Sequence, residues 1–348
     1  MNAATESALR QAWLARGPLT RLLYPLSLVY RALFAARRLL FAWGWRRATR
    51  LPVPVVVVGN VVVGGAGKTP TTIAVVRHLL AQGWHPGVVS RGHGRQQDGV
   101  LAVGASSDPA DTGDEPLLIQ RATGVPVWVA KQRATAGLAL LKAHPAVDVI
   151  VCDDGLQHLA LARDLEVVVF DDRGLGNGWC LPAGLLREPW PRRSDAPALV
   201  LHQQRQPAPP FFPGFVARRA LADEAVNAQG RATPLAELAN NAAPLCALAG
   251  IARPEVFFDM LAERGLRLAH AWPLPDHADL AALWPDLLAQ CPPGATVLCT
   301  EKDAVKLWPL LTGTSPQVLA VPLMLTPEPA FFHALDARLS SRHGPQTP

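Results

Sequence analysis

A chain of 348 residues is long enough to form two domains, and its 33 Pro and 27 Gly are spread without a period, which excludes a collagen-like or a disordered protein. The five cysteines are odd in number and have no C-x-x-C spacing, so neither a disulfide framework nor a zinc site is expected, and a reducing cytosolic setting fits best. The net charge of +5 is uneven, because residues 1–50 hold nine Arg and one acidic residue and carry +8, which leaves −3 for the rest of the chain. We expect this basic head to meet an anionic surface.

The basic head contains an apolar and aromatic stretch, residues 22–45, that Arg31, Arg37 and Arg38 interrupt. These charges leave no run of the ~18 uncharged residues that a transmembrane helix needs. An Arg-rich amphipathic helix with Trp and Tyr rings is typical of a segment that lies on an anionic membrane surface, which predicts that role for residues 1–50. The alternative is a helix packed on the protein's own core with solvated arginines. No nucleic-acid partner is expected, because Leu and Phe stand between the cations.

A glycine-rich turn follows the head and lies between an apolar run at 54–60, typical of a buried parallel strand, and a helical pattern at 73–80. This context is that of a P-loop, the phosphate-binding turn of ATP-binding enzymes. Glycine allows backbone N–H groups to turn onto phosphate oxygens, Lys68 can reach the β- and γ-phosphates, and the Thr69 hydroxyl can bind Mg²⁺. Val62 replaces the first glycine of the strict G-x-x-x-x-G-K-[ST] pattern. The residues expected to bind ATP are Gly64, Gly65, Ala66, Gly67, Lys68, Thr69 and Pro70.

Two polar turns come next along the chain. The turn at 90–95 is a basic loop that could grip phosphate or simply be solvated. Asp114 stands near a predicted helix start, and spacing alone favours a capping role for it.

An apolar run at 147–152 predicts a second buried strand, and it ends in Asp153 and Asp154. Carboxylates at a strand end are where P-loop proteins organise Mg²⁺, and a metal removes the cost of placing two acids together. The alternative is a solvated turn. Gln157 and His158 follow on the same turn, and for His158 a structural and a catalytic role remain equally open.

Further strands are predicted at 125–129, 166–170, 198–201 and 296–299, with helices between them, including one at 254–264. This alternation predicts an α/β fold with a mostly parallel, P-loop NTPase-like sheet. Pro-rich and Ala/Asn-rich stretches near 206–213 and 239–244 indicate a boundary. We expect a membrane-surface region at 1–50, a kinase core at 51–240 and a smaller α/β domain at 241–340.

A series of motifs, in order over nearly the whole chain, resembles the tetraacyldisaccharide 4′-kinase (lipid A 4′-kinase) family of Gram-negative bacteria. They are Val58–Asn60 with Gly64–Pro70, Ser90–Gly92, Gly113–Pro116, Asp153–His158, Gly176-Asn177, Leu181–Gly184, Arg187–Pro189, Ala249–Pro254, Asp276-His277 and Thr300–Lys306.

The resemblance implies that ATP phosphorylates the 4′-hydroxyl of an acylated glucosamine disaccharide 1-phosphate, giving lipid IVA in lipid A biosynthesis at the cytoplasmic face of the inner membrane, with the protein peripheral or monotopic. It further implies that Asp114 is the base and His277 its partner, in place of capping for Asp114. Lys68 and Arg187 would serve the transferring phosphate. The implied Mg²⁺ residues are Thr69, Glu115, Asp153 and Asp154.

Three positions depart from the family pattern, which usually has Tyr where His93 stands, Pro where Leu185 stands and an aromatic residue where Ala278 stands. The main alternative function is a membrane-recruited P-loop ATPase or GTPase switch without a small-molecule acceptor. A soluble metabolite kinase would leave the Arg- and Trp-rich head unexplained.

Overall fold

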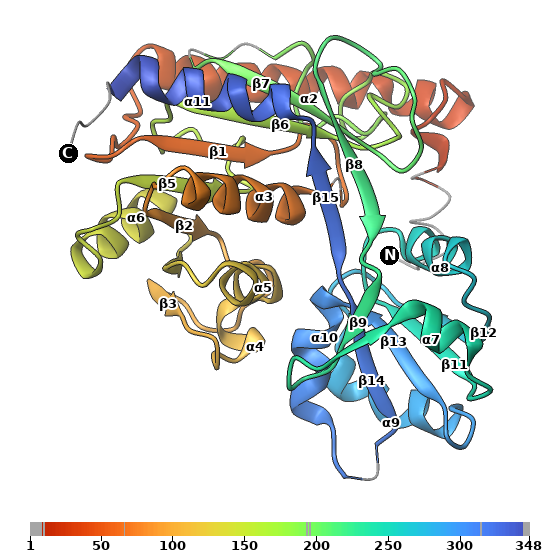
Figure 1. Cartoon of the computed structure of the whole chain (residues 1–348). Helices are drawn as coiled ribbons and strands as arrows, with labels where there is room; N and C mark the ends of the chain where they lie inside the picture. The colour runs from red at the N-terminus through yellow and green to blue at the C-terminus, as the bar shows by residue number, and fades with distance from the viewer. Residues whose placement is uncertain are drawn as a thin grey trace.

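The computed structural model of the chain describes residue 9 and residues 11–65, 67–192, 194, 196–313 and 315–343. The chain forms a larger and a smaller α/β lobe (Figure 1).

The larger lobe is built on a nine-stranded sheet whose seven inner strands are parallel and whose two edge strands are antiparallel to their neighbours. In spatial order the strands are β15 (Leu323–Pro327), β8 (Phe215–Leu221), β7 (Ala198–Gln204), β6 (Leu165–Phe170), β1 (Val55–Gly59), β5 (Val149–Asp153), β2 (Pro86–Ser90), β4 (Val127–Val129) and β3 (Leu101–Val103). The mostly parallel α/β fold expected from the sequence is therefore confirmed.

The central strands are wholly buried because helices or loops cover both faces of the sheet. Val56 and Val58 pack in one core with α3 (Lys68–Ala81), α5 (Asp114–Thr123) and α11 (Pro329–His343). Val55 and Val57 point to the opposite face and pack with α6 (Arg133–Ala143) and the loops around residues 156–190. This period of two explains why the uninterrupted valine run forms a central strand. The short α4 (Pro109–Thr112) precedes α5.

The smaller lobe has a six-stranded sheet with helices on both faces. Its strands in spatial order are β10 (Ala232–Pro234), β9 (Glu224–Val226), β14 (Gln317–Val321), β13 (Thr296–Thr300), β11 (Leu245–Ala249) and β12 (Leu268–Pro273). One face is covered by α7 (Leu235–Asn240) and α8 (Pro254–Glu263), and the other by α9 (Leu280–Ala289), α10 (Glu301–Leu307) and the 3-10 helix η1 (Trp308–Leu310).

The strands divide between the sheets at other residues than the expected boundary at 240. β9 and β10 already belong to the smaller sheet, whereas β15 and α11 return to the larger lobe. The reason is the antiparallel pairing of β8 with β15, in which Leu221 lies opposite Leu323 (Figure 1). Composition did not reveal this pairing, because about a hundred residues separate the partners.

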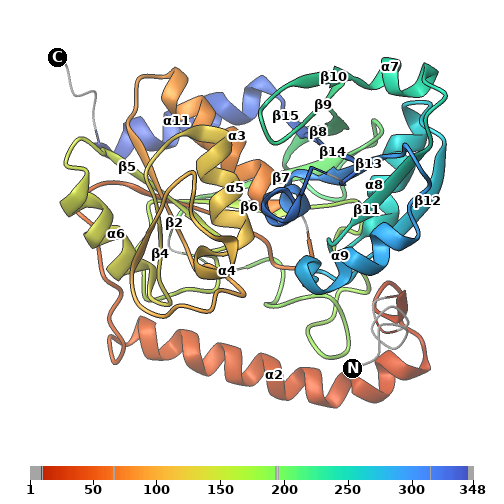
Figure 2. The same ribbon diagram turned by 90° about the horizontal axis from the view of Figure 1, so that it is seen from below.

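The basic head forms α2 (Pro18–Ala42), a long helix along one edge of the larger lobe (Figure 2). Its inner face is tied to the lobe by polar bonds: Ser27 Oγ donates to the Cys180 carbonyl at 2.8 Å, and Tyr30 Oη to the Arg187 carbonyl at 2.7 Å. The expected helix is confirmed. Among the described residues, no helix combines the length and the apolar character needed to cross a bilayer.

Candidate active site

The glycine-rich turn lies between β1 and α3, as a P-loop must. Gly64 and Gly67 have φ of 91° and 72°, a region that favours glycine. At Gly67 a side chain would also collide with Gln203, whose Nε2 donates to the Gly67 carbonyl at 2.7 Å and to Thr71 Oγ1 at 2.8 Å. The turn is thus braced from β7. Of the seven expected ATP-binding residues, Ala66 lies outside the described part of the chain.

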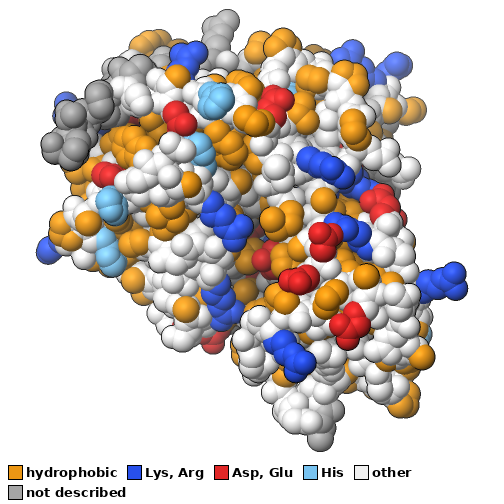
Figure 3. Space-filling view, viewed as in Figure 1, with side chains coloured by type: hydrophobic (Ala, Val, Ile, Leu, Met, Phe, Trp, Pro, Cys, Tyr) orange, Lys and Arg blue, Asp and Glu red, His pale blue; other side chains and the backbone are white. Residues whose placement is uncertain are grey.

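A cavity of about 550 Å³ opens between the lobes in front of this turn. Charged side chains of both signs are scattered on the face where the lobes meet (Figure 3). Gly65, Gly67, Lys68, Thr69 and Pro70 line the cavity together with Glu115 from α5, Asp276 and Lys302 from the smaller lobe, and an apolar wall that includes Ile73, Phe257, Met260, Leu323 and Leu325. A pocket with an apolar wall and a few convergent polar groups is the form expected of a small-molecule site.

The acidic pair lies at the end of β5, where Asp153 is the register partner of Val58 on β1, the strand that leads to the P-loop. Asp153 is buried; its Oδ1 accepts a hydrogen bond from Thr72 Oγ1 at 2.8 Å, and its Oδ2 has no partner among the described residues. Burial and the nearby carboxylates of Glu115 and Asp154 raise the pKa of Asp153 to about 7. A cation beside these oxygens would offset that cost. The donor set fits Mg²⁺, which prefers oxygen ligands and usually keeps water and phosphate oxygens besides one or two carboxylates.

Asp154 contacts two cationic side chains near the P-loop. Its Oδ2 lies 3.8 Å from Lys68 Nζ and its Oδ1 3.3 Å from Arg187 Nη1. Its carbonyl accepts a hydrogen bond from Arg133 Nη2 at 3.1 Å, and its backbone has a positive φ of 46°. The structure therefore brings Lys68, Arg187 and the acidic pair together, although they come from three distant parts of the sequence.

Asp114 and His277 meet across the two lobes. Asp114 is buried at the first turn of α5, and its Oδ2 lies 3.3 Å from His277 Nδ1. His277 precedes α9 in the smaller lobe with a positive φ of 62°. Gly113, and not Asp114, occupies the N-cap position of α5, so the capping role that spacing alone favours is wrong.

The charges around Asp114 keep its carboxylate ionised. Burial opposes ionisation, but the contact with His277 and the charges of Lys302 and Lys306 outweigh it and hold the pKa of Asp114 well below its usual range. The same contact raises the pKa of His277 against the opposing effect of its burial. Such a pair can orient and accept the proton of a hydroxyl group placed beside it.

Two lysines at this pair carry no role in the sequence interpretation, although the segment 300–306 contains both. Lys302 and Lys306 stand four residues apart and so share one face of α10; their Nζ atoms lie 3.8 and 3.5 Å from Asp114 Oδ2. Lys302 Nζ also lies 2.8 Å from Asp276. Their i, i+4 spacing was the available signal, whereas nothing in the sequence pointed to the brace that Gln203 provides.

His93 and His158 have definite places in the structure. His93 stacks on His277 with ring centroids 5.1 Å apart, so an imidazole fills the position where the family usually has Tyr. Burial and nearby guanidinium groups lower the pKa of His158 to about 4, which keeps it neutral. The guanidinium groups belong to Arg133, Arg163, Arg37 and Arg91.

The P-loop and Glu115, Asp276 and Lys302 line one cavity, and the acidic pair and the Asp114–His277 pair contact these residues or their neighbours. Together they define a kinase of the P-loop class. Comparison with known proteins gives the family. Residues 19–340 match the LpxK family, described as tetraacyldisaccharide-1-P 4′-kinase, and the chain belongs to that family.

Curated relatives are similar in sequence to this protein over nearly its whole length. The chain is 57% identical to a tetraacyldisaccharide 4′-kinase of Acidovorax sp. (strain JS42), over 96% of this chain and 94% of the relative. It is 53% identical to a tetraacyldisaccharide 4′-kinase of Polaromonas naphthalenivorans (strain CJ2), over 98% and 99%. A crystal structure of LpxK from Aquifex aeolicus in complex with ATP superposes with a TM-score of 0.76 at 27% identity, covering 93% of this chain and 99% of that one.

Proposed function

We propose that this protein transfers the γ-phosphate of ATP to the 4′-hydroxyl of tetraacyldisaccharide 1-phosphate and so forms lipid IVA. The observation that carries the proposal is the Asp114–His277 pair, 3.3 Å apart, in the same interlobe region as Lys68 of the P-loop. A nucleotide switch needs the P-loop but has no use for a buried carboxylate–imidazole pair that can face an acceptor hydroxyl. The family to which the chain belongs supports the same activity.

Phosphoryl transfer requires phosphate binding, charge neutralisation and a proton acceptor, and different residues supply each of these. The P-loop amides, Lys68 and Arg187 hold the phosphates and stabilise the charge that spreads over the transferring group. Thr69, Glu115, Asp153 and Asp154 would hold Mg²⁺, which when bound neutralises phosphate charge. Asp114 orients the sugar hydroxyl and accepts its proton. A carboxylate with a lowered pKa is a weak base, but it suffices because little covalent bonding to the nucleophile precedes a loose transition state.

A group of arginines beside the turn at residues 153–158 could bind the anionic 1-phosphate end of the substrate. Arg37 of α2 and Arg91 are exposed and near His158 together with Arg133, which is buried and whose Nε has no hydrogen-bond partner among the described residues. Arg37 Nη2 donates to the Gln157 carbonyl at 3.1 Å, so α2 takes part in this group. We assign it to the sugar 1-phosphate, since guanidinium groups bind phosphate through charge-assisted hydrogen bonds.

The outer face of α2 suits a lipid surface. Leu22, Leu26, Val29 and Leu33 follow one another at helical spacing and are all exposed, Leu22 to 77%. Trp43 and Trp45 are exposed just beyond the helix end. We assign this face to the inner membrane on its cytoplasmic side, where it would place the protein peripherally and bring the acylated substrate to the cavity.

A labelling experiment tests the activity. The purified protein is incubated with [γ-³²P]ATP, Mg²⁺ and tetraacyldisaccharide 1-phosphate in detergent, and the lipid fraction is counted. Label in the lipid is the expected result. Hydrolysis of ATP at full rate with no labelled lipid would instead support the nucleotide switch.

A further inference from the structure

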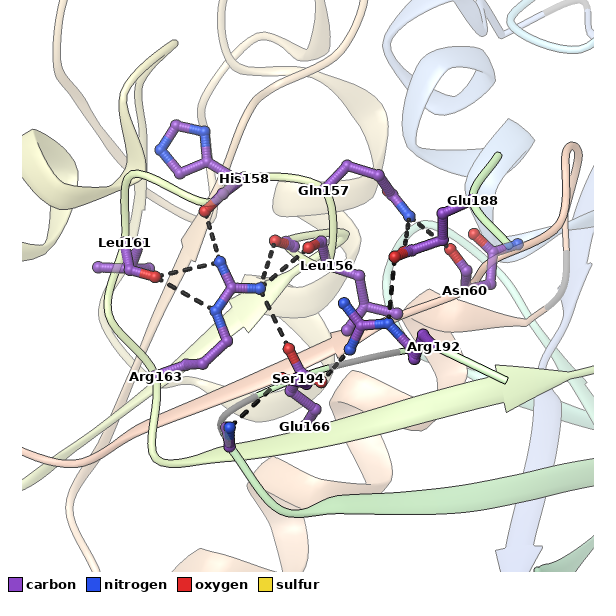
Figure 4. Close-up of polar contacts among 12 residues, drawn as sticks. Asn60, Leu156, Gln157, His158, Leu161, Arg163, Glu166, Glu188, Arg192 and Ser194 are labelled. Carbon is purple, nitrogen blue, oxygen red and sulfur yellow. Dashed lines mark hydrogen bonds and ion pairs between the residues drawn. The ribbon is translucent and has the colours of Figure 1, made fainter. Parts of the chain in front are cut away.

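A network of buried charged side chains connects β6 with the loop that carries Arg187, and none of its members lines the cavity. It consists of Arg163, Glu166, Glu188 and Arg192, whose side chains are at most 8% exposed (Figure 4). Two cations and two carboxylates make the group neutral. Burying such groups costs so much desolvation that well-packed apolar residues would stabilise a fold as well or better. Stability therefore does not explain the group, whereas its contacts suggest a role in positioning.

One end of the group is anchored in the sheet. Glu166 lies on β6; one of its carboxylate oxygens is 3.3 Å from Arg163 Nη1, and the other contacts Arg192 Nη1. Arg192 Nε in turn lies 3.3 Å from Glu188 Oε2. Arg192 therefore bridges a carboxylate on a rigid central strand and a carboxylate on the loop that carries Arg187.

The other end of the network reaches the P-loop and the turn at residues 153–158, which begins with the acidic pair. Gln157 Nε2 donates to Glu188 Oε1 and to the Asn60 carbonyl, at 3.0 Å in both cases. Asn60 Nδ2 donates to the carbonyl of Gly64 at 3.2 Å. Arg163 Nη1 donates to the carbonyl of Leu156 at 3.0 Å and thus braces the same turn (Figure 4).

The residue next to Glu188 is Arg187, whose guanidinium reaches Asp154. The Arg187 backbone is held on two further sides, because its N–H donates to the Val61 carbonyl at 2.7 Å and its own carbonyl accepts from Tyr30 Oη. The loop is also held before Arg187, where Leu186 forms backbone bridges to Val62 and Cys180, and Glu188 holds it directly after Arg187.

We propose that Arg192 is a positioning residue for phosphoryl transfer. By clamping Glu188 to Glu166, it fixes Arg187 against Asp154 and, through Gln157 and Asn60, fixes the start of the P-loop. Arg192 touches neither nucleotide nor acceptor in this role. The inference rests on the proposed function, because its effect is read in the transfer rate.

The test is Arg192→Lys in the full-length protein. Lysine keeps the charge but cannot bridge two carboxylates as a planar guanidinium does. We expect kcat to fall about tenfold to a hundredfold, as small misplacements of a catalytic group do, with KM for ATP changed by less than about threefold. In an Arg187→Ala background the same substitution should lower kcat by a clearly smaller factor than it does alone, because the route through Arg187 is gone and only the route through Gln157 and Asn60 remains.

Asp164→Asn is the matched control. Asp164 is also a buried carboxylate at the base of β6, where it accepts hydrogen bonds from the Val55 N–H at 3.0 Å and from Arg50 at 2.9 Å; Val55 begins β1, whereas the P-loop follows the end of that strand. Its loss should lower Tm but leave kcat of the folded protein unchanged.

Wild-type kcat in Arg192→Lys, or losses that simply multiply in the Arg187→Ala background, would overturn the proposal. Should Arg192→Lys not fold, Glu166→Gln takes its place with the same expectations. If the wild type itself labels no lipid, the proposed function fails, and the positioning role is then read from the rate of ATP hydrolysis, where Arg192→Lys must still cause the loss and Asp164→Asn must not.

Discussion

Lys302 of the smaller lobe lies 3.7 Å from Glu115 of the larger lobe, so a single ammonium group links the two sides of the cavity. It contacts Asp276 and Asp114 as well, and although burial favours the neutral amine, these carboxylates raise the pKa of Lys302 further. Lys302 therefore stays charged and neutralises an acidic group that otherwise has only His277 and Lys306 as cationic partners among the described residues.

Lys302→Met should lower kcat/KM for ATP about a hundredfold, because a preorganised cation that lines the cavity is lost and three carboxylates are left unbalanced. Steady-state transfer to the lipid acceptor measures the effect. The control is Lys131→Met, which removes an exposed lysine whose ion pair within the described part of the chain is with the exposed Asp98, and it should change nothing. Equal rates for the two variants would show that Lys302 has no part in the reaction.

Asp114→Asn should reduce kcat by about 10²- to 10⁴-fold, the range typical of a lost general base, while binding of nucleotide is retained. Asn keeps the side-chain shape, so the first turn of α5 should persist. Lys68→Ala, by comparison, should weaken both nucleotide binding and transfer. Turnover of the Asp114→Asn variant at the wild-type rate would refute the assignment of Asp114 as the proton acceptor.

The contact between His277 and Asp114 predicts a pH-dependent contribution to stability. Because the folded state raises the pKa of His277 above the unfolded value of about 6.5, the stabilisation is complete below that pH and is lost as the pH rises through the folded pKa. The neighbours that set this pKa are Asp114, Asp276 and Lys302, with His93 stacked on the ring.

The free energy of unfolding in urea should thus differ between wild type and His277→Gln more at pH 6 than at pH 9. In an Asp114→Asn background the difference should become nearly independent of pH. A difference that grows toward pH 9 would contradict the ion pair.

The outer face of α2 can be tested with vesicles that contain anionic phospholipid. Leu26→Asp combined with Leu33→Asp should weaken co-sedimentation about tenfold or more, because two apolar side chains no longer enter the bilayer. Leu138→Asp removes a comparably exposed leucine from α6, on another surface, and should bind as the wild type does. Retention of the double variant on vesicles would place the membrane contact elsewhere.

The sequence revealed those parts of the fold in which local pattern and burial coincide. β1 and β5 are continuous apolar runs because both faces of a central parallel strand are buried, and the glycines of the P-loop mark a backbone that other residues avoid. The pairing of β8 with β15 has no such local sign, since it depends on chain segments about a hundred residues apart.

In the site, too, local motifs could be read from the sequence, whereas contacts between distant segments could not. Lys68 and Thr69 could be assigned from the motif alone, whereas the proximity of Asp114 and His277 arises only when the lobes meet and was expected from family resemblance. The bracing contacts of Gln203 and Arg192 could not be foreseen, because a single Gln or Arg in a sequence carries no information about which carbonyl or carboxylate it will reach.

The pairing of Leu221 with Leu323 also has a topological meaning. The chain leaves the larger sheet along β8 and re-enters it along β15, as in a β-hairpin whose turn has been replaced by a whole second lobe. The smaller lobe is therefore an insertion, and the larger lobe could close its sheet with a short loop at that point. A phosphate-binding protein lacking the insertion would keep its P-loop and acidic pair, yet it would lack His277 and the α10 lysines that contact Asp114. The insertion is what brings His277, Lys302 and Lys306 to Asp114, and under the proposed function it supplies the second half of the site for the acceptor hydroxyl.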